Sequence, residues 1–387
     1  MEYRKEDIGG KNHLNSDFCS KMNFGGAVRI NKCGISILLA LAILLLLFTY
    51  NTHKSSSNSS SPLTSTKFLK KAINDGSNIS AKSLLIAAVD VAERGGQEVV
   101  QVRASSNDLG QQVKGKTKEG AQDRVTQGDF RSHRVMYYGL RKAFPQVKVI
   151  SEEHMANTDT RDIEVPTNVN NEISNIVIGD TNISAEDISV WIDPLDATQE
   201  YTENLLEYVT TMVCVAVKGV PIIGVIHKPF PPVQTYWAIV GYGHSQNLDV
   251  AKKSEKSEEK GSTVSKSPTK IVVSRSHAGS VRNLTEQILG SKQTFEIKTA
   301  AGAGYKVLEV IKGNADAYLH VTNIKKWDLC AGNAILNALE GTMVTLNGEK
   351  LDYSPDTDPM NSKGILAYIK SSELSDKFKE SPLYIES

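Results

Sequence analysis

A run of acidic residues around a proline, WIDPLDAT at positions 191–198, carries the strongest chemical signal in this 387-residue chain. An apolar strand delivers Asp193 near the start of this run, and Pro194 forbids a helix and predicts a tight turn. The turn brings Asp196 and the backbone carbonyl of Leu195 round to the same side as Asp193. Hard oxygen ligands of this kind suit Mg²⁺, so the run predicts a magnesium site.

Three further acids are candidate partners for this site. Glu152 and Glu153 follow a predicted strand at residues 147–150, and Asp328 follows Trp327 at the start of a predicted helix. Two carboxylates about 4 Å apart repel by roughly 4 kcal/mol at an effective dielectric constant near 20, so several in one pocket require cations. A single acid is most often a helix cap or a surface charge. The placement of several acids at strand ends favours a shared metal site.

The elements that must position these acids follow from hydrophobic periodicity. In the first half, the spacing of apolar residues predicts helices over 81–102 and 129–144, and strands over 147–150, 190–192, 209–217, 222–227 and 235–240. In the second half it predicts strands over 271–273, 317–321, 343–346 and 365–369, and helices over 281–289, 305–311 and 329–339. Lys218-Gly219 predicts a hairpin turn. The expected fold class is therefore α+β followed by α/β.

The segment Gly34–Tyr50 is apolar and uncharged, and as a helix it would span roughly 26 Å, close to the thickness of a thin bilayer. We interpret it as an uncleaved anchor. The alternative, a cleaved signal peptide, fits less well with the long polar N-terminus and the lack of an A-x-A site. Lys21, Arg29 and Lys32 precede the segment, so the positive-inside rule predicts a single-pass type II protein with a luminal body.

The chain is expected to divide into six parts: a cytoplasmic tail at 1–33, an anchor at 34–50, a stem at 51–75, an α+β metal-binding half at 76–243, a disordered loop at 244–268 and an α/β half at 269–387. Asn58, Asn78, Asn182 and Asn283 begin glycosylation sequons, which agrees with a luminal body.

Composition narrows the range of functions. The 44 basic and 44 acidic residues balance, which argues against nucleic-acid polymers as partners. The four cysteines are Cys19, Cys33, Cys214 and Cys330, and only the last two would be luminal. Both lie in apolar runs, which predicts buried thiols rather than a disulfide framework. There is no Cys/His spacing typical of a metal site.

The motif DPLDAT, the upstream SEE at 151–153 and the downstream KKWD at 325–328 resemble those of the lithium-sensitive, magnesium-dependent phosphatases. This family includes inositol monophosphatases, inositol polyphosphate 1-phosphatases and bisphosphate nucleotidases. The resemblance covers residues 80–370. It implies the layered αβαβα sandwich of the inositol monophosphatase and fructose-bisphosphatase type. It also implies two or three Mg²⁺ ions per site and sensitivity to lithium.

By this resemblance the metal ligands are Glu152, Asp193, the carbonyl of Leu195, Asp196 and Asp328. The run DRVTQGD at 123–129 matches the family's D-x-V-T-x-x-D pattern. Asp129 then corresponds to the aspartate that pairs with the motif threonine, here Thr198, and these two are the implied catalytic residues. Glu153 is expected to support the site without binding metal. Ala197 replaces the family's usual glycine, and a positive φ at that position would cost about 1 kcal/mol.

Other segments point to a substrate within the family. The Glu200-Tyr201 pair resembles nucleotidases, whereas inositol monophosphatases usually have N-F. SRSH at 274–277 and AGAGYK at 301–306 resemble nucleotide-binding elements, in which glycine amides and a lysine can face a phosphate. The implied contacts to the adenosine monophosphate part of the substrate are Ser274, His277, Gly302 and Lys306.

The implied reaction is hydrolysis of the 3′-phosphate of 3′-phosphoadenosine 5′-phosphate, which gives AMP and phosphate. Together with the anchor, these motifs resemble the Golgi-resident enzymes of this class, which support sulfation, and a luminal domain on the Golgi membrane is expected. Two alternatives stay open: an inositol phosphate phosphatase, and a non-catalytic membrane-tethered protein of the same fold. The sequence is compatible with a monomer or a homodimer.

Overall fold

The computed structural model describes residues 78–105, 108–116, 120, 122–155, 158–168, 170–249, 268–275, 281–282, 285–286, 294–369 and 377. No helix within these ranges is both long and apolar enough to cross a membrane. The predicted tail, anchor and stem, most of the predicted loop at 244–268, and His277 lie outside the described residues.

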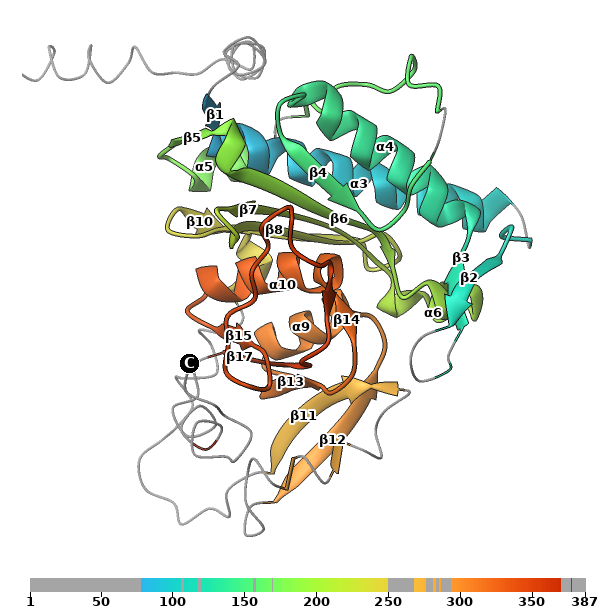
Figure 1. Ribbon diagram of the computed structural model, residues 1–387, viewed down its shortest axis with the longest axis vertical. Helices are drawn as coiled ribbons and strands as arrows, with labels where there is room; N and C mark the ends of the chain where they lie inside the picture. The colour runs from blue at the N-terminus through green and yellow to red at the C-terminus, as the bar shows by residue number, and fades with distance from the viewer. Residues whose placement is uncertain are drawn as a thin grey trace, which may run out of the picture. The chain divides into compact units, whose positions relative to one another are not determined.

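Two helices, α3 (Ala81–Ser105) and α4 (Gln127–Ala143), form the first layer of the fold (Figure 1). Glycines let α3 lie close to its neighbours. A Cβ atom at Gly95 would come within 2.5 Å of the sulfur of Met136 on α4, and one at Gly96 would come within 2.5 Å of the His227 ring. Any side chain at either position would therefore push this layer apart.

The start of α4 is set by a capping box. The Thr126 hydroxyl accepts a hydrogen bond from the Gly128 amide, and the Asp129 carboxylate accepts one from the Thr126 amide. These contacts satisfy amides that the first helical turn leaves without partners. The helix therefore begins two residues before the predicted start and ends at Ala143, one residue before the predicted end and two before Pro145.

A six-stranded sheet forms the second layer, in the order β10-β9-β8-β7-β6-β4. Its strands are β4 (Lys148–Ser151), β6 (Ile188–Asp196), β7 (Thr210–Val217), β8 (Val220–Lys228), β9 (Gln234–Ile239) and β10 (Gly243–His244). β4 is parallel to β6, and the other pairs are antiparallel. Lys218 and Gly219, both with positive φ, form the predicted hairpin turn between β7 and β8.

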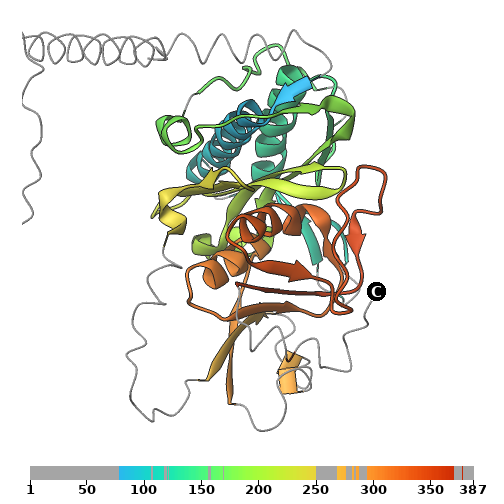
Figure 2. The ribbon, with the colours of Figure 1, turned by 90° about the vertical axis from the view of Figure 1, so that its left-hand side faces the viewer.

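The third layer contains α9 (Ala303–Ile311) and α10 (Lys326–Ala338), which cover the other face of the six-stranded sheet (Figure 2). Residues alternate between the two faces along β7: Met212 packs with α9 and α10, whereas Val213 packs with α3 and α4. Gly224 on β8 makes the contact close, because a Cβ atom there would lie 2.2 Å from the Ala331 carbonyl oxygen.

A five-stranded sheet forms the fourth layer, in the order β12-β11-β13-β17-β15. Its strands are β11 (Thr269–Ser274), β12 (Phe295–Ala300), β13 (Ala317–His320), β15 (Thr342–Val344) and β17 (Ile365–Tyr368). Val281 is buried against the outer face of this sheet. The described residues therefore show the layers α, β, α and β. The outer helix predicted at 281–289 lies mostly outside them.

Shorter elements complete the described fold. Three strand pairs are β1 (Asn78–Ser80) with β5 (Asn182–Ser184), β2 (Gln112–Lys116) with β3 (Gln122–Val125), and β14 (Ile324–Lys325) with β16 (Met360–Asn361). The short helices are α5 (Asn171–Ile176) and α6 (Thr198–Thr202), and the 3₁₀ helices are 185–187, 206–208 and 246–248.

A disulfide joins Cys214 on β7 to Cys330 on α10, so the prediction of two free thiols was wrong. Both residues are buried, as expected. The close packing of α10 on the sheet brings their Cα atoms to 5.6 Å, a normal separation for a disulfide. Their sequence separation of 116 hid this proximity, which results from the packing of the layers and not from any local pattern.

Candidate active site

Three of the predicted ligands meet in one place. Glu152 follows β4, Asp193 lies on β6, and Asp328 lies in the first turn of α10. Each offers a carboxylate oxygen, and these oxygens all lie within 4.8 Å of one another. The neighbouring ends of β4 and β6 place the first two acids, and the start of α10 brings the third from the opposite layer. The convergence predicted from separate segments is therefore present.

The path of the chain around Pro194 differs from the predicted tight turn. β6 continues through the proline to Asp196, and its pairing with β7 is irregular between Asp193 and Asp196. A bulge of this kind lets a strand change the direction of its side chains without ending. Within the bulge, Asp193 accepts a hydrogen bond from the Leu195 amide at 3.1 Å. Ala197 has φ 68° and ψ 45°, the left-handed conformation that favours glycine.

The charge of Asp196 acts on Asp193 and Asp328, and its carboxylate accepts a hydrogen bond from α9 in the helix layer. Its Oδ2 atom accepts hydrogen bonds from the Gly304 amide at 2.9 Å and from the Thr210 hydroxyl at 3.2 Å. The Gly304 amide therefore holds a candidate metal ligand. Gly302 has φ 66°, and a Cβ atom there would lie 3.0 Å from the same oxygen. A side chain at position 302 would therefore crowd Asp196.

Burial and mutual repulsion disfavour the charged forms of the clustered acids. Burial raises the pKa of Asp193 and of Asp328 well above the usual range, and the neighbouring carboxylates raise both further. Burial also raises the pKa of Glu152. The donors are oxygen atoms in a buried acidic cluster, which is the environment that a hard divalent cation such as Mg²⁺ requires. The residues present therefore fit a metal site.

Lys114, on β2, was missed by the sequence analysis. Its Nζ atom donates to Glu152 at 2.8 Å and also to Glu153, and it lies 3.8 Å from Asp123. Burial lowers the pKa of Lys114, but the two glutamates outweigh this effect and raise it well above the usual range. Glu153 thus bonds to a lysine beside the site, and its supporting role stays a prediction.

The predicted pair of Asp129 and Thr198 is in contact. The Thr198 hydroxyl lies 3.0 Å from Asp129 Oδ1 and 3.1 Å from the Leu195 carbonyl oxygen. The other carboxylate oxygen of Asp129 accepts from the amide and hydroxyl of Thr126, at 2.7 and 2.6 Å. Burial raises the pKa of Asp129 to about 7. Thr126 was part of the DRVTQGD run, which could have identified its role.

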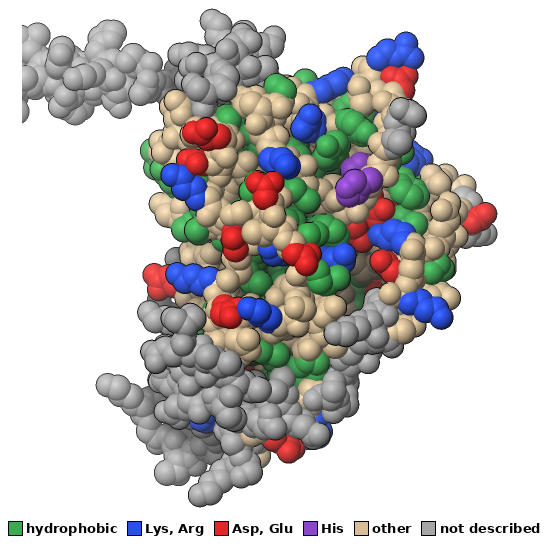
Figure 3. Space-filling view, viewed as in Figure 1, with side chains coloured by type: hydrophobic (Ala, Val, Ile, Leu, Met, Phe, Trp, Pro, Cys, Tyr) green, Lys and Arg blue, Asp and Glu red, His purple; other side chains and the backbone are tan. Residues whose placement is uncertain are grey.

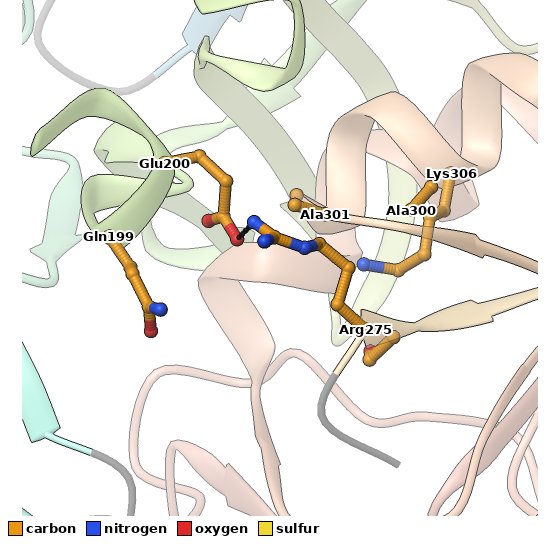
Figure 4. A pocket seen from close by; sticks show the side chains of 8 residues that line it. Gln199, Glu200, Arg275, Ala300, Ala301 and Lys306 are labelled. Carbon is orange, nitrogen blue, oxygen red and sulfur yellow. Dashed lines mark hydrogen bonds and ion pairs between the residues drawn. The ribbon is translucent and has the colours of Figure 1, made fainter. Parts of the chain in front are cut away.

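A cavity of about 400 Å³ adjoins the acids, and three of the four predicted substrate contacts line it (Figure 4). Its lining residues are Gln199, Glu200, Ser274, Arg275, Ala300, Ala301, Gly302 and Lys306. Ser274 also contacts His320 Nδ1, at 3.2 Å. Lys306 is only 3% exposed, and burial lowers its pKa to about 8, although the charge of Asp196 acts in the opposite direction. On the face shown in Figure 3, acidic and basic side chains gather around a hollow to the right of centre.

The chain matches a profile of the Inositol monophosphatase family over residues 80–377. This match spans most of the sequence, and the layered fold carries the family's acidic motifs in one pocket. The chain therefore belongs to the inositol monophosphatase family.

Two relatives have names that differ in substrate. A mouse protein named Golgi-resident adenosine 3′,5′-bisphosphate 3′-phosphatase is 46% identical over 303 residues, which cover 77% of this chain and 80% of the mouse protein. A zebrafish protein named inositol monophosphatase 3 is 48% identical over 298 residues, which cover 76% of this chain and 82% of the zebrafish protein.

Among solved structures, CysQ from Bacteroides thetaiotaomicron, a bacterial member of the family, aligns with a TM-score of 0.52 at 21% identity. The match covers 75% of this chain and 98% of CysQ. At this level of identity the likeness is one of fold alone.

Proposed function

We propose that this protein is a magnesium-dependent phosphatase that removes the 3′-phosphate of adenosine 3′,5′-bisphosphate and releases AMP. The observation that carries the proposal is the buried acidic cluster of Glu152, Asp193 and Asp328 beside a polar cavity that contains Lys306. The mouse relative named for this reaction supports the choice of substrate. A phosphate held at the cluster would leave the rest of a nucleotide room in the cavity.

The acids Glu152, Asp193 and Asp328 would hold one Mg²⁺, and Asp196 with the Leu195 carbonyl would complete the set of ligands. Bound Mg²⁺ supplies charge neutralisation for the phosphate and lowers the pKa of a coordinated water. The raised pKa values of the cluster follow from burial and mutual repulsion, and both penalties fall when a cation is bound. Lys114 would compete for the Glu152 carboxylate.

Asp129 and Thr198 supply the proton path. The Thr198 hydroxyl lies between the Asp129 carboxylate and the Leu195 carbonyl, so its oxygen is positioned to accept a proton from a water on its open side. As it does so, it can pass its own proton to Asp129 Oδ1. A pKa of Asp129 near 7 suits a group that accepts and returns a proton at neutral pH. Thr126 keeps the other carboxylate oxygen occupied, which fixes the orientation of Asp129.

The proposed location is the Golgi membrane, with a single-pass anchor at residues 34–50 and the catalytic domain in the lumen. Two features support it. The disulfide between Cys214 and Cys330 is of a kind that persists in oxidising compartments. Asn78 and Asn182, which begin sequons, are exposed on the paired strands β1 and β5. Protease protection of intact vesicles and glycosidase treatment would test this topology.

The second candidate is hydrolysis of an inositol phosphate, which the name of the zebrafish relative favours. Phosphate release by the detergent-solubilised full chain should be measured on adenosine 3′,5′-bisphosphate and on inositol 1-phosphate, with magnesium, with a chelator and with lithium. We expect magnesium-dependent turnover of the nucleotide, and Asp193→Asn should abolish it. Faster turnover of inositol 1-phosphate would reject the nucleotide in favour of the second candidate. Full activity in the presence of chelator would reject the metal site.

A further inference from the structure

Arg275 crosses the cavity from one half of the protein to the other. It follows the last residue of β11, and its side chain extends towards α6, where it meets Glu200 (Figure 4). Nη1 lies 2.8 Å from Glu200 Oε1 and 3.2 Å from Glu203 Oε2. These contacts hold the guanidinium over the space that a bound nucleotide would fill.

The guanidinium group of Arg275 has N–H donors beyond those that bond to the two acids. The side chain is 41% exposed, whereas that of Glu200 is only 12% exposed. Both acids bond to Nη1, and no other described residue forms a hydrogen bond or ion pair with Nη2 or Nε. A guanidinium has five N–H donors in a plane, an arrangement that matches two oxygens of a phosphate. The arginine can therefore keep Glu200 and still bind an anion along its open edge.

Lys306 is the second cation among the described residues that line the cavity, and nearby acids already act on its charge. Its Nζ atom is buried over the Tyr318 ring at 5.1 Å, and the charges of Asp196, Glu200 and Asp328 all act on it. Its charge is thus shared with acids of the metal site. Arg275 is the more accessible of the two cations and lies on the side of the cavity near α6.

We propose that Arg275 is a specificity-determining residue that binds a second, uncleaved phosphate of the substrate, with Glu200 and Glu203 fixing its fork across the cavity. This inference rests on the proposed function, because it requires that the cavity hold a bisphosphorylated substrate. Glu203 is the more exposed of the two acids, and its charge opposes the incoming phosphate. The three residues together set how strongly a second phosphate is favoured.

The test compares kcat/KM for adenosine 3′,5′-bisphosphate with kcat/KM for adenosine 3′-monophosphate, which lacks the second phosphate. Loss of a charge-assisted bidentate contact in Arg275→Ala should lower the ratio of the two values about 10- to 100-fold. Arg275→Lys keeps the charge without the fork and should give an intermediate ratio. Glu203→Gln removes an opposing charge and should raise the ratio. Arg161→Ala, which breaks an exposed ion pair with Asp159 outside the cavity, is the matched control.

The outcomes separate the two ideas. If the wild-type protein hydrolyses neither nucleotide, the proposed function fails and this inference falls with it. If the wild-type protein prefers the bisphosphate but Arg275→Ala lowers both values equally, the proposed function stands and the role of Arg275 is overturned. A fall in the ratio for Arg275→Lys and a rise for Glu203→Gln support the role even if Arg275→Ala does not fold.

Discussion

Replacing one acid of the metal site should make the protein more stable than the wild type without magnesium and less stable than the wild type with it. The carboxylate oxygens of Glu152, Asp193 and Asp328 lie within 4.8 Å of one another. Two full charges at that separation repel by about 3.5 kcal/mol at an effective dielectric constant of 20. Asp328→Asn removes two of the three repelling pairs. It also keeps an oxygen that can accept the hydrogen bond that the Lys325 amide now donates at 3.2 Å.

The gain in metal-free protein is smaller than the sum of two pairs. Burial and mutual repulsion raise the pKa of Asp193 and Asp328, so proton uptake can relieve part of the repulsion, and Lys114 neutralises part of the charge on Glu152. We therefore expect Asp328→Asn to raise the free energy of unfolding in chelator by about 1–3 kcal/mol at pH 8. In saturating magnesium the wild-type protein gains binding energy that the variant lacks, so the wild type becomes the more stable of the two.

Urea unfolding of both proteins, in chelator and in magnesium, measures this reversal. Asp356→Asn is the matched control, because Asp356 is an exposed acid in a surface ion pair with Lys148 and should respond equally to the two conditions. If Asp328→Asn lowers stability as much in chelator as in magnesium, the three acids do not share a charged pocket and the assignment of the metal site is wrong.

Three further perturbations test individual features of the fold. Ala197→Gly should raise the free energy of unfolding by about 1 kcal/mol with activity retained, because the left-handed φ of 68° strains alanine; a lower urea midpoint would contradict this. The double variant Cys214→Ala, Cys330→Ala should have a free energy of unfolding about 3–5 kcal/mol lower than that of the wild type, since the bond closes a loop of 116 residues. A wild-type melting temperature that stays the same after the disulfide is reduced would refute this. Burial lowers the pKa of His227 from 6.5 to about 4, so its neutral form stabilises the fold fully above pH 6.5, and this contribution is lost as the pH falls towards 4. The loss should reach about 2 kcal/mol at pH 5, and His227→Gln should show a pH dependence weaker by that amount in urea titrations.

Most of the elements could be predicted because each carries its own periodicity. Amphipathic spacing identified α3, α4, α9 and α10 to within a few residues at their ends, and the apolar runs identified the central strands of both sheets. Strand β12 was missed, since the sequence FEIKTA mixes charged and apolar residues at a sheet edge. A strand whose residues are only partly buried leaves a weak signal.

The convergence of Glu152, Asp193 and Asp328 could be predicted because these acids follow recognisable strand and helix boundaries, and the family motifs add to that reasoning. Lys114 could not, because its contact depends on where the β2–β3 hairpin folds over the site. The disulfide was invisible for the same reason: β7 and α10 meet only through the stacking of layers. Pro194 led to the wrong prediction of a tight turn, because a β-bulge accommodates the proline as well as a turn does. Contacts between distant segments were the common limit.

The helix α10 carries Asp328 in its first turn and Cys330 two residues later, and the cysteine is bonded to β7. The disulfide therefore fixes the position of the helical turn that carries the Asp328 carboxylate. Without that bond, as under reducing conditions, packing alone would hold the turn that carries Asp328 against the sheet.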